Sequence, residues 1–384
     1  MTDRPWQTDS ALPETLADLR AAIPALDDRT YLNWGASGPS PRTVVSATED
    51  ALEYHEFESP RTAGMYGAAA DIFDAARSTV ADHLGATESE IALVQSTTMG
   101  INRVGSAIDW GPGDVVVTTD LEHVAGRLPW SRLRDRFGIE VRVLETDAGV
   151  IDLDVLEEAL DGADLLCVSA VDWLYGRRHP VTEMVELAHE HDALALIDAV
   201  QVPGQLPIDV TEWGADFVAG AGHKWLLGPW GAGFLYVSSD VVEEVEPMHV
   251  GHRSVAEVDG GAYELSPDAA RFELGTTSPA PYAGITRGIE AIESIGMDTI
   301  RERIRTLRDR FVSQVPPDRL RSPSAPHSGL VTIQVTDPER TVESLAETSI
   351  TARSLPLPES VRFSFHAVNT EAEVDELVDT LDCL

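Results

Sequence analysis

The chain has 384 residues, of which 65 are acidic and 28 basic, so its formal net charge at pH 7 is −37. A surface this acidic repels nucleic acid and anionic membranes, and we expect neither as a partner. Because 43% of the residues are hydrophobic, the composition predicts a folded core beneath an acidic surface and argues against a disordered chain.

The charge also indicates the solvent in which the protein works. Repulsion among so many carboxylates strains a compact state in dilute buffer, whereas molar salt shortens the Debye length to ~3 Å and screens it. Lysine is almost absent, since 27 of the 28 basic residues are arginine. Together these two features predict adaptation to a very salty cytoplasm, and we expect a halophilic source.

Two features predict a cytoplasmic location. The sequence has no basic-then-apolar leader, and no apolar stretch reaches the ~18 residues that a membrane span needs. Its only cysteines are Cys167, in an apolar segment, and Cys383, next to the last residue. A structural disulfide between them is improbable from these positions, which favours a reducing compartment.

Short apolar segments alternate with amphipathic ones between about residues 70 and 240. This pattern predicts helices at 71–84, 153–160 and 182–189, and buried strands at 91–95, 115–118, 141–144, 165–170, 193–197, 217–219 and 233–237. Such alternation is typical of an α/β domain with a mostly parallel sheet between two layers of helices. Ligands in such domains bind at the carboxyl ends of the strands.

The pattern changes after about residue 255. One long helical run is predicted at 282–315, followed by a strand at 330–335, a helix at 341–347, a strand at 361–365 and a closing helix at 371–381. We therefore predict two domains. Residues 25–254 form a large α/β domain, and residues 1–24 together with 255–384 form a smaller α+β domain.

The only lysine of the chain is Lys224. Arginine supplies the same charge but cannot lose its proton in a protein, so an amine that must attack a carbonyl carbon has to be lysine. The neighbouring residues, Ala221-Gly222-His223 and Trp225, are mostly small or apolar. They favour an amine whose pKa is lowered by desolvation, and Lys224 is therefore the first candidate for a catalytic nucleophile.

Polar side chains follow several of the predicted strands. Thr97 and Thr98 lie after the strand at 91–95 and before a helix, where hydroxyls and free N–H groups can hold a phosphate; ordinary helix capping is the alternative. Asp198 ends a very apolar strand and needs a partner, which a protonated pyridine nitrogen or the next turn could supply. His123 follows another strand, where a purely structural histidine is the alternative.

Two further patterns bear on ligands. Arg362 lies in an otherwise apolar segment and could hold a carboxylate through two hydrogen bonds, although most such arginines form structural ion pairs. His189 and His191 look like metal ligands, but a spacing of two residues puts them on different faces of a helix. We predict no metal site.

Read together, these segments resemble the class V aminotransferase family of pyridoxal-phosphate (PLP) enzymes, which includes the cysteine desulfurases. The most specific match surrounds Gly222-His223-Lys224-Trp225, followed by Asp198-Ala199-Val200-Gln201, and the likeness extends from Tyr31 to Thr370. It implies the fold-type-I PLP transferase fold, with a mostly parallel seven-stranded sheet in the large domain. It also implies a homodimer whose active sites lie at the interface.

The resemblance implies a role for each candidate residue. Lys224 forms a Schiff base with PLP and then carries the α-proton of a small amino-acid substrate, and Asp198 pairs with the pyridine nitrogen. His123 stacks on the cofactor ring and Gln201 bonds its phenolic oxygen. The remaining assignments are Thr97, Thr98 and His223 to the phosphate, Thr276 to the phosphate of the second subunit, and Arg362 and Asn33 to the substrate.

The sequence departs from the family pattern at two cofactor positions. Ala221 stands where a serine is common, three residues before the lysine, and Trp173 stands where an asparagine is expected. The first change removes one hydroxyl from the phosphate, and the second leaves the ring oxygen to Gln201 alone. Neither change affects Lys224 or Asp198, so we still expect PLP to bind.

A third departure concerns sulfur. A cysteine desulfurase presents a mobile nucleophilic cysteine shortly before the carboxylate-binding arginine, and the corresponding segment, 350–358, contains none. Segments 249–254 and 271–281 resemble instead the cysteine/cystine C–S lyases, in which the sulfur leaves by elimination. We expect C–S cleavage of cysteine or a relative. Transamination or epimerisation of another amino acid remains open, as does a non-catalytic scaffold, although a scaffold has no reason to keep one lysine.

Overall fold

The structure is a computed structural model that describes residue 6 and residues 11–325 and 327–384. Of the segment 1–24 assigned to the small domain, residues 1–5 and 7–10 therefore lie outside the described part. The α-helices are α1 (Leu16–Ala21), α2 (Arg42–Glu53), α3 (Met65–Leu84), α4 (Thr97–Gly105), α5 (Val124–Phe137), α6 (Leu153–Leu160), α7 (Val181–Glu190), α8 (Val210–Trp213), α9 (Ala280–Ile295), α10 (Met297–Val312), α11 (Pro338–Glu347) and α12 (Glu371–Asp382).

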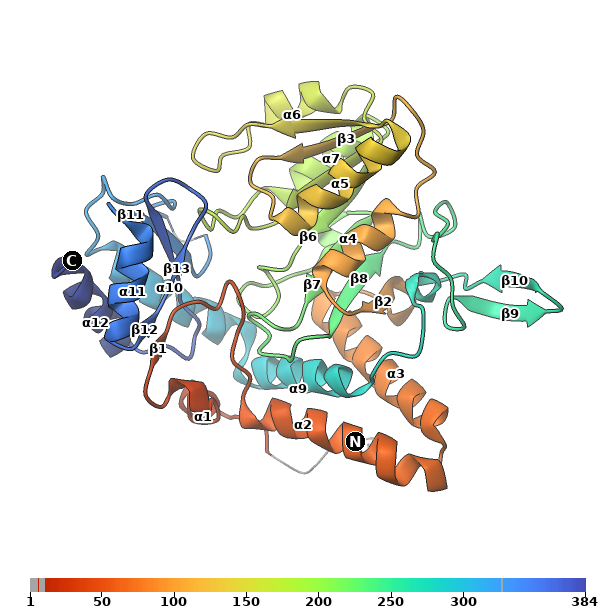
Figure 1. Cartoon of the computed structure of the whole chain (residues 1–384), viewed down its shortest axis with the longest axis horizontal. Coiled ribbons are helices and arrows are strands. Elements are labelled where there is room, and N and C mark those ends of the chain that lie inside the picture. Colours follow the sequence, from red (N-terminus) through yellow and green to blue (C-terminus); the bar gives the residue numbers. More distant parts are fainter. Residues whose placement is uncertain (1–5, 7–10, 326) are drawn as a thin grey trace.

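In the described part of the chain, the strands form one large sheet and three small ones (Figure 1). They are β1 (Thr30–Tyr31), β2 (Ile91–Val94), β3 (Val115–Thr119), β4 (Glu140–Leu144), β5 (Leu165–Ser169), β6 (Leu194–Asp198), β7 (Phe217–Ala221), β8 (Gly233–Val237), β9 (Val255–Asp259), β10 (Ala262–Leu265), β11 (Leu330–Gln334), β12 (Ile350–Thr351), β13 (Arg353–Ser354) and β14 (Ser360–Ser364).

Within the described residues, the large sheet has seven strands in the order β2-β8-β7-β6-β5-β3-β4. Neighbouring strands are parallel except around β8, which runs antiparallel to β2 and β7. This confirms the predicted mostly parallel seven-stranded sheet. All seven predicted strands are present, because each is an apolar run bounded by polar or glycine residues.

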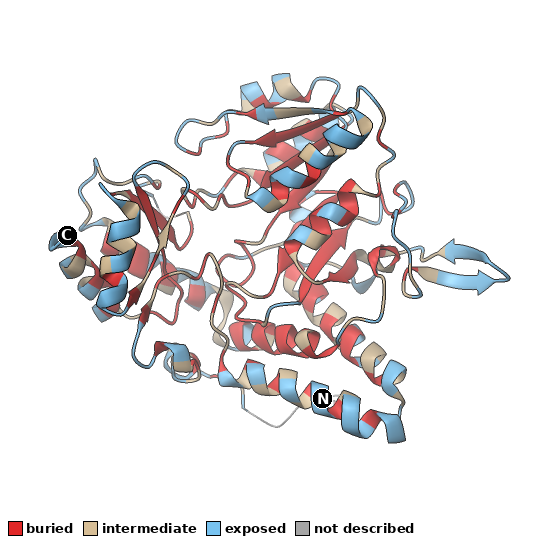
Figure 2. Ribbon diagram, viewed as in Figure 1, coloured by how far each residue is buried: buried red, intermediate tan, exposed pale blue. Residues whose placement is uncertain are grey.

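Both faces of this sheet are buried except at the edge strand β4, where Glu140 and Val143 are exposed (Figure 2). Side chains alternate between the two faces of a strand, so in β5 Leu166 and Val168 join one apolar cluster while Leu165 and Cys167 join the other. Helices α3, α6 and α7 contribute to the first cluster, and α4 and α5 to the second. The sheet is therefore a rigid platform whose strand ends can hold side chains in fixed positions.

The prediction of one long helix at 282–315 was wrong. The structure has two helices there, α9 and α10, with Gly296 between them at φ +89°. Glycine adopts this backbone conformation without steric cost and so ends the first helix. Helix α9 then packs against α2 and α3, which the sequence pattern did not reveal.

The C-terminal part contains a three-stranded antiparallel sheet in the order β11-β14-β13. In this sheet Arg353 lies directly opposite Arg362. The segment that begins with β1 reaches across to this part of the chain, because β1 pairs with β12 and Asn33 bridges to Ser364. The division into domains 25–254 and 1–24 plus 255–384 stays a prediction.

A hairpin of β9 and β10 extends from the body of the protein (Figure 1). Most of its residues are exposed, including Val258 and Tyr263. An isolated two-stranded hairpin is marginally stable at best in water. We therefore expect this hairpin to need a further packing partner. Across the described residues, none of the helices combines the length and the apolar character needed to cross a membrane.

Candidate active site

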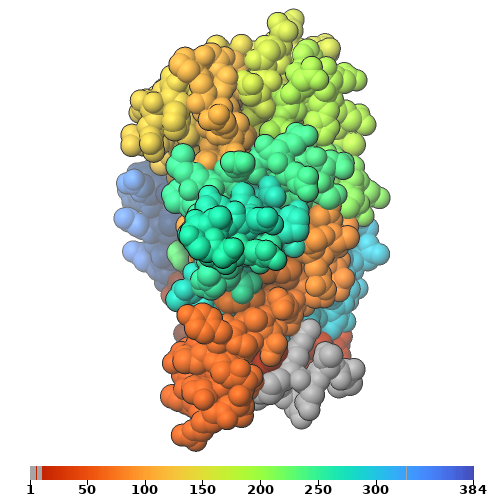
Figure 3. Space-filling model, turned by 90° about the vertical axis from the view of Figure 1, so that its right-hand side faces the viewer, coloured from red at the N-terminus to blue at the C-terminus, as the bar shows by residue number. Residues whose placement is uncertain are grey.

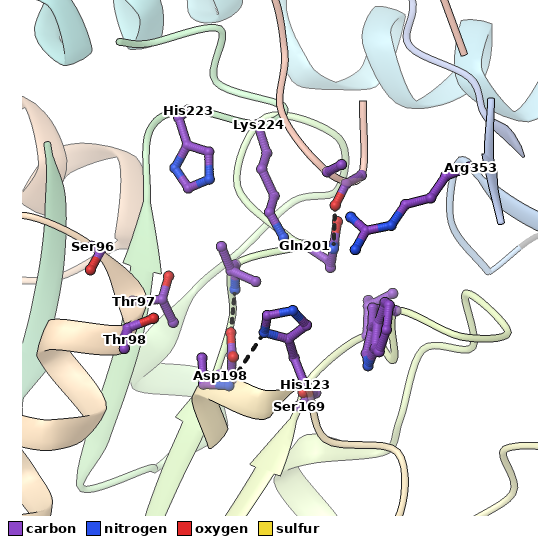
Figure 4. A pocket seen from close by; sticks show the side chains of 16 residues that line it. Ser96, Thr97, Thr98, His123, Ser169, Asp198, Gln201, His223, Lys224 and Arg353 are labelled. Carbon is purple, nitrogen blue, oxygen red and sulfur yellow. Dashed lines mark hydrogen bonds between the residues drawn. The ribbon is translucent and has the colours of Figure 1, made fainter. Parts of the chain in front are cut away.

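A cavity of about 250 Å³ lies at the carboxyl ends of the large-sheet strands. Loops after β2, β3, β5, β6 and β7 line it together with Gly35 and Arg353, and Arg353 lies across it from Thr97 and Thr98 (Figure 4). The labelled polar side chains in this lining are Ser96, Thr97, Thr98, His123, Ser169, Asp198, Gln201, His223, Lys224 and Arg353. Seven of the candidate residues thus meet in one place, as expected for strand ends of a parallel sheet.

Lys224 follows β7 in a tight loop that is fixed by backbone bonds. Gly228 N–H donates to the Gly222 carbonyl oxygen at 2.8 Å, and Gly38 N–H donates to the His223 carbonyl oxygen at 2.7 Å. Burial lowers the pKa of Lys224 to about 7; the carboxylate of Asp198 opposes that fall. The loop therefore presents an amine that is largely unprotonated in mildly alkaline solution.

Asp198 ends β6 with only 4% of its surface exposed. Its Oδ1 atom accepts a 2.9 Å hydrogen bond from Val200 N–H. Burial raises the pKa of this carboxyl group, while that bond and the charge of Lys224 lower it. A buried carboxylate facing a cavity is suited to a cationic partner such as a protonated ring nitrogen.

At the start of α4, the structure shows which of the neighbouring Ser96 and Thr97 caps the helix and which is free to bind a phosphate. The Ser96 hydroxyl accepts a 3.2 Å bond from Met99 N–H and is the helix cap. The buried Oγ1 atom of Thr97 has no hydrogen-bond partner among the described residues. An unpaired hydroxyl at a helix N-terminus fits a phosphate oxygen. Burial lowers the pKa of His223, on the same cavity, to about 4, so its neutral ring can donate one bond.

The Gln201 side-chain amide is held on both sides. Its nitrogen donates to the Gly35 carbonyl oxygen at 2.9 Å, and its oxygen accepts from the Trp225 indole nitrogen at 2.8 Å. An amide nitrogen carries two hydrogens, so one N–H remains for a ligand. This arrangement supports the predicted contact with a ring oxygen.

His123 and Trp173 meet edge to face, with ring centroids 5.1 Å apart and planes at 85°. His123 Nδ1 accepts a 3.3 Å bond from Ala125 N–H, so its proton is on Nε2. Burial, and then the charge of Lys224, lower the pKa of His123. Trp173, which replaces the expected asparagine, lines the same cavity, and its buried indole nitrogen has no partner within the described chain.

Two arginines form a cationic wall, and only one of them was anticipated. Arg362 is buried, donates to the Trp173 carbonyl oxygen at 2.7 Å, and leaves Nε and Nη2 without partners among the described residues. Burial, and then the charge of Arg353, lower the pKa of Arg362 to about 9. Arg353 itself lines the cavity. Two neighbouring guanidinium groups, of which Arg362 keeps unpaired N–H donors, are suited to a carboxylate.

Glu122 is a second residue that the sequence analysis missed. It is buried and accepts hydrogen bonds from the Ser169 hydroxyl at 2.6 Å, Ser169 N–H at 3.0 Å and the Thr119 hydroxyl at 3.0 Å. Burial raises the pKa of Glu122 to about 7. The sequence did offer one signal for Glu122, because it directly precedes the candidate residue His123. A carboxylate on a buried loop must find hydrogen-bond donors.

Three candidate residues are absent from the cavity lining. Arg362 lies behind it, with Nη2 close to Gly35. Asn33 stands two residues before Gly35, and its buried Oδ1 has no partner in the described part of the chain. Thr276 is exposed at φ +53° on a surface segment. Within the described residues, no group of three or more histidine, cysteine or acidic side chains could hold a metal ion.

Both the sequence and the fold of the chain resemble those of known proteins. The family model described as Aminotransferase class-V matches residues 30–377. The chain is 34% identical to a protein named probable cysteine desulfurase from Methanothermobacter thermautotrophicus, over 95% of this chain and 97% of the relative.

Solved structures resemble the whole chain. The apo structure of a cysteine desulfurase from Thermococcus onnurineus superposes with a TM-score of 0.87 at 28% identity and covers 98% of both chains. Two structures of the cystine C–S lyase C-DES give TM-scores of 0.89 and 0.88 at 26% and 25% identity, covering 94% of this chain and 98% of theirs. One of them contains glycine linked to PLP, and the other contains the reaction product cysteine persulfide.

Proposed function

The chain belongs to the class-V aminotransferase family, and from that premise we propose that it is a PLP-dependent enzyme that cleaves the C–S bond of cysteine or a close relative by elimination. One observation carries the proposal. The only lysine of the chain is desolvated inside a cavity that it shares with the buried Asp198 carboxylate and the unpaired Thr97 hydroxyl.

The residues present fit the cofactor. The unpaired Thr97 hydroxyl at the start of α4 and the neutral His223 suit the phosphate, and Asp198 suits the ring nitrogen. Gln201 has one N–H free for the ring oxygen. When bound, PLP draws electrons away from the substrate's Cα and so makes its proton acidic.

The side chains of the cavity divide the remaining work. Arg353 and Arg362 hold the substrate carboxylate and thereby fix which bond at Cα faces Lys224. The Lys224 amine, with a pKa near 7, takes the proton from Cα as a general base. The sulfur then leaves from Cβ with the electron pair of its bond.

The positions of the two cysteines favour elimination over transfer of sulfur to the protein. Cys167 is fully buried in β5, Cys383 follows the C-terminal helix, and neither lines the cavity. Elimination needs no protein thiol, because cysteine and water yield sulfide, pyruvate and ammonia. Both thiols are free, which supports the proposal of a cytoplasmic location.

We further propose that the enzyme acts as a homodimer in which Thr276 reaches the phosphate of the other subunit. Thr276 is exposed and lies outside the cavity of its own chain. The β9–β10 hairpin, which precedes the Thr276 segment in the chain, projects toward the viewer in Figure 3. Its exposed Val258 and Tyr263 support burial against a second copy.

Product analysis tests the proposed reaction. The PLP-loaded protein is incubated separately with cysteine and with cystine, and sulfide, pyruvate and alanine are measured. We expect pyruvate in both reactions, together with sulfide from cysteine. Alanine in place of pyruvate would indicate desulfuration, and a keto acid with conversion of PLP to pyridoxamine phosphate would indicate transamination. Either result would contradict elimination while leaving the family assignment intact.

A further inference from the structure

A second cavity lies beside α4 and the end of β2. It is lined by Arg103 of α4, Tyr282 of α9, the end of β2 and the segment around Glu273. It shares no lining residue with the first cavity. Its volume, measured as the space open to the centre of a water-sized particle, is about 10 Å³. This is room for roughly one water molecule.

Arg103 is a buried cation without a counter-charge. Only 6% of its surface is exposed, and its Nε and Nη1 atoms have no hydrogen-bond partner among the described residues. Burial lowers the pKa of Arg103, and no neighbouring carboxylate offsets that effect. A buried guanidinium in this state is costly, and proteins normally pair it with an anion.

The one acidic side chain that lines the cavity is already engaged. Glu273 accepts hydrogen bonds from Arg77 at 2.7 Å, Arg253 at 2.8 Å and Leu93 N–H at 2.9 Å. Arg77 and Arg253 therefore already hold this carboxylate. Among the lining residues two arginines, Arg103 and Arg253, face one glutamate, which leaves the cavity a net positive charge.

A second unpaired donor faces the same space. The Tyr282 hydroxyl belongs to a side chain with 1% of its surface exposed, and it has no partner within the described residues. Its ring packs edge to face on Phe73, which holds the hydroxyl in place. A buried O–H and a buried guanidinium lining one small cavity together make a donor set for an anion.

We propose that this cavity binds one chloride ion between the Arg103 guanidinium and the Tyr282 hydroxyl. A space for about one water-sized particle suits a monatomic anion better than phosphate, sulfate or an organic anion. The ion neutralises Arg103 and satisfies both unpaired donors. The inference does not depend on the proposed reaction, because it uses none of the residues of the candidate active site.

Crystallography with bromide tests the site directly. Crystals of the PLP-loaded protein are grown with bromide in place of chloride, and anomalous scattering locates the halide. We expect one peak within hydrogen-bonding reach of Arg103 and Tyr282. A cavity filled by water, or by a carboxylate from a second copy of the chain, would overturn the proposal.

Thermal unfolding tests the energetic consequence. Chloride is exchanged for bulky gluconate at constant potassium concentration and ionic strength. We expect a saturable rise in Tm with chloride, and we expect Arg103→Met to lose it. Arg61→Met, which removes an exposed positive charge, should keep it. An equal rise in Arg103→Met would overturn the proposal.

A milder variant covers the case in which Arg103→Met does not fold. Tyr282→Phe removes only the hydroxyl, and we expect about tenfold more chloride at half-saturation, the usual effect of losing one hydrogen bond to a charged group. An unchanged half-saturation concentration would contradict the assigned donor pair.

Discussion

Gln201 accepts a 2.8 Å hydrogen bond from the indole nitrogen of Trp225, the residue that follows the lysine. The same amide donates to the Gly35 carbonyl oxygen. One buried side chain thus connects the loop after β6, the loop after β7 and the N-terminal segment, which together form three walls of the candidate active site. The position of Lys224 depends on this connection.

Replacing Trp225 by phenylalanine should weaken the fold. The change leaves the Gln201 oxygen buried without a donor, and we expect the free energy of unfolding to fall by about 1–3 kcal/mol. Chemical denaturation in molar KCl measures the difference. Trp230→Phe is the matched control, because Trp230 is 73% exposed and its bond to Ser37 has water as a substitute. Equal losses in the two variants would contradict the role given to Gln201.

The pKa of Lys224 predicts the pH dependence of cofactor capture. Only the unprotonated amine attacks the aldehyde, and its pKa lies near 7 where the ordinary value is 10.5. The rate at which apo protein captures PLP should therefore rise with pH and reach half its maximum near pH 7, as followed by visible absorbance. Asp198 raises the pKa of this amine, so Asp198→Asn should move the midpoint to lower pH. A midpoint near 10 would rule out a desolvated lysine.

The unpaired hydroxyl of Thr97 predicts a specific loss of cofactor affinity. In Thr97→Val the dissociation constant for PLP should rise about tenfold, because one hydrogen bond to a charged phosphate is lost. Equilibrium dialysis measures this constant. Thr118→Val is a close control: Thr118 is also buried with an unpaired hydroxyl, but it lies in β3 away from the cavity. If both variants bind PLP equally well, the phosphate is held elsewhere.

Arg353 should contribute to substrate binding more than to chemistry. In Arg353→Met the KM for cysteine should rise about tenfold, because a charge-assisted bond to the carboxylate is lost, while visible absorbance of the bound cofactor stays unchanged. Steady-state kinetics provides the test, and Arg61→Met serves as the control for charge. A fall in kcat at constant KM would assign Arg353 a different role.

The net charge of −37 predicts a requirement for salt. Lowering KCl from molar concentrations to 0.1 M lengthens the Debye length to ~10 Å and restores repulsion among surface carboxylates. We expect Tm to fall and activity to be lost on dialysis, as followed by circular dichroism and product assays. An uncharged osmolyte at equal osmolality should not rescue either. A Tm independent of salt would contradict adaptation to a salty cytoplasm.

Local patterns were enough to predict the large sheet and the centre of the site. Apolar runs marked each of its strands, and Lys224 and Asp198 stood at strand ends where chemistry is expected in this fold class. The break at Gly296 was missed because the apolar periodicity continues through it. Its left-handed backbone becomes visible only in the structure.

Other site features depend on tertiary contacts. Arg353 joins the cavity because a short turn places it opposite Arg362, and the sequence alone did not fix that register. Glu122 is held in place by a hydrogen bond from the Ser169 hydroxyl, 47 residues later in the chain. Arg103 looks like a surface residue of a helix in the sequence, but the structure buries it beside a small cavity.

The two arginines proposed to bind the substrate carboxylate and the proposed catalytic lysine are positioned by different sheets. Arg353 and Arg362 lie on β13 and β14, whereas Lys224 follows β7. The two sheets are nevertheless coupled through charge, because, besides burial, Arg362 and Arg353 both lower the pKa of Lys224. A substitution at either arginine is therefore expected to change the basicity of the amine as well as the grip on an acid group.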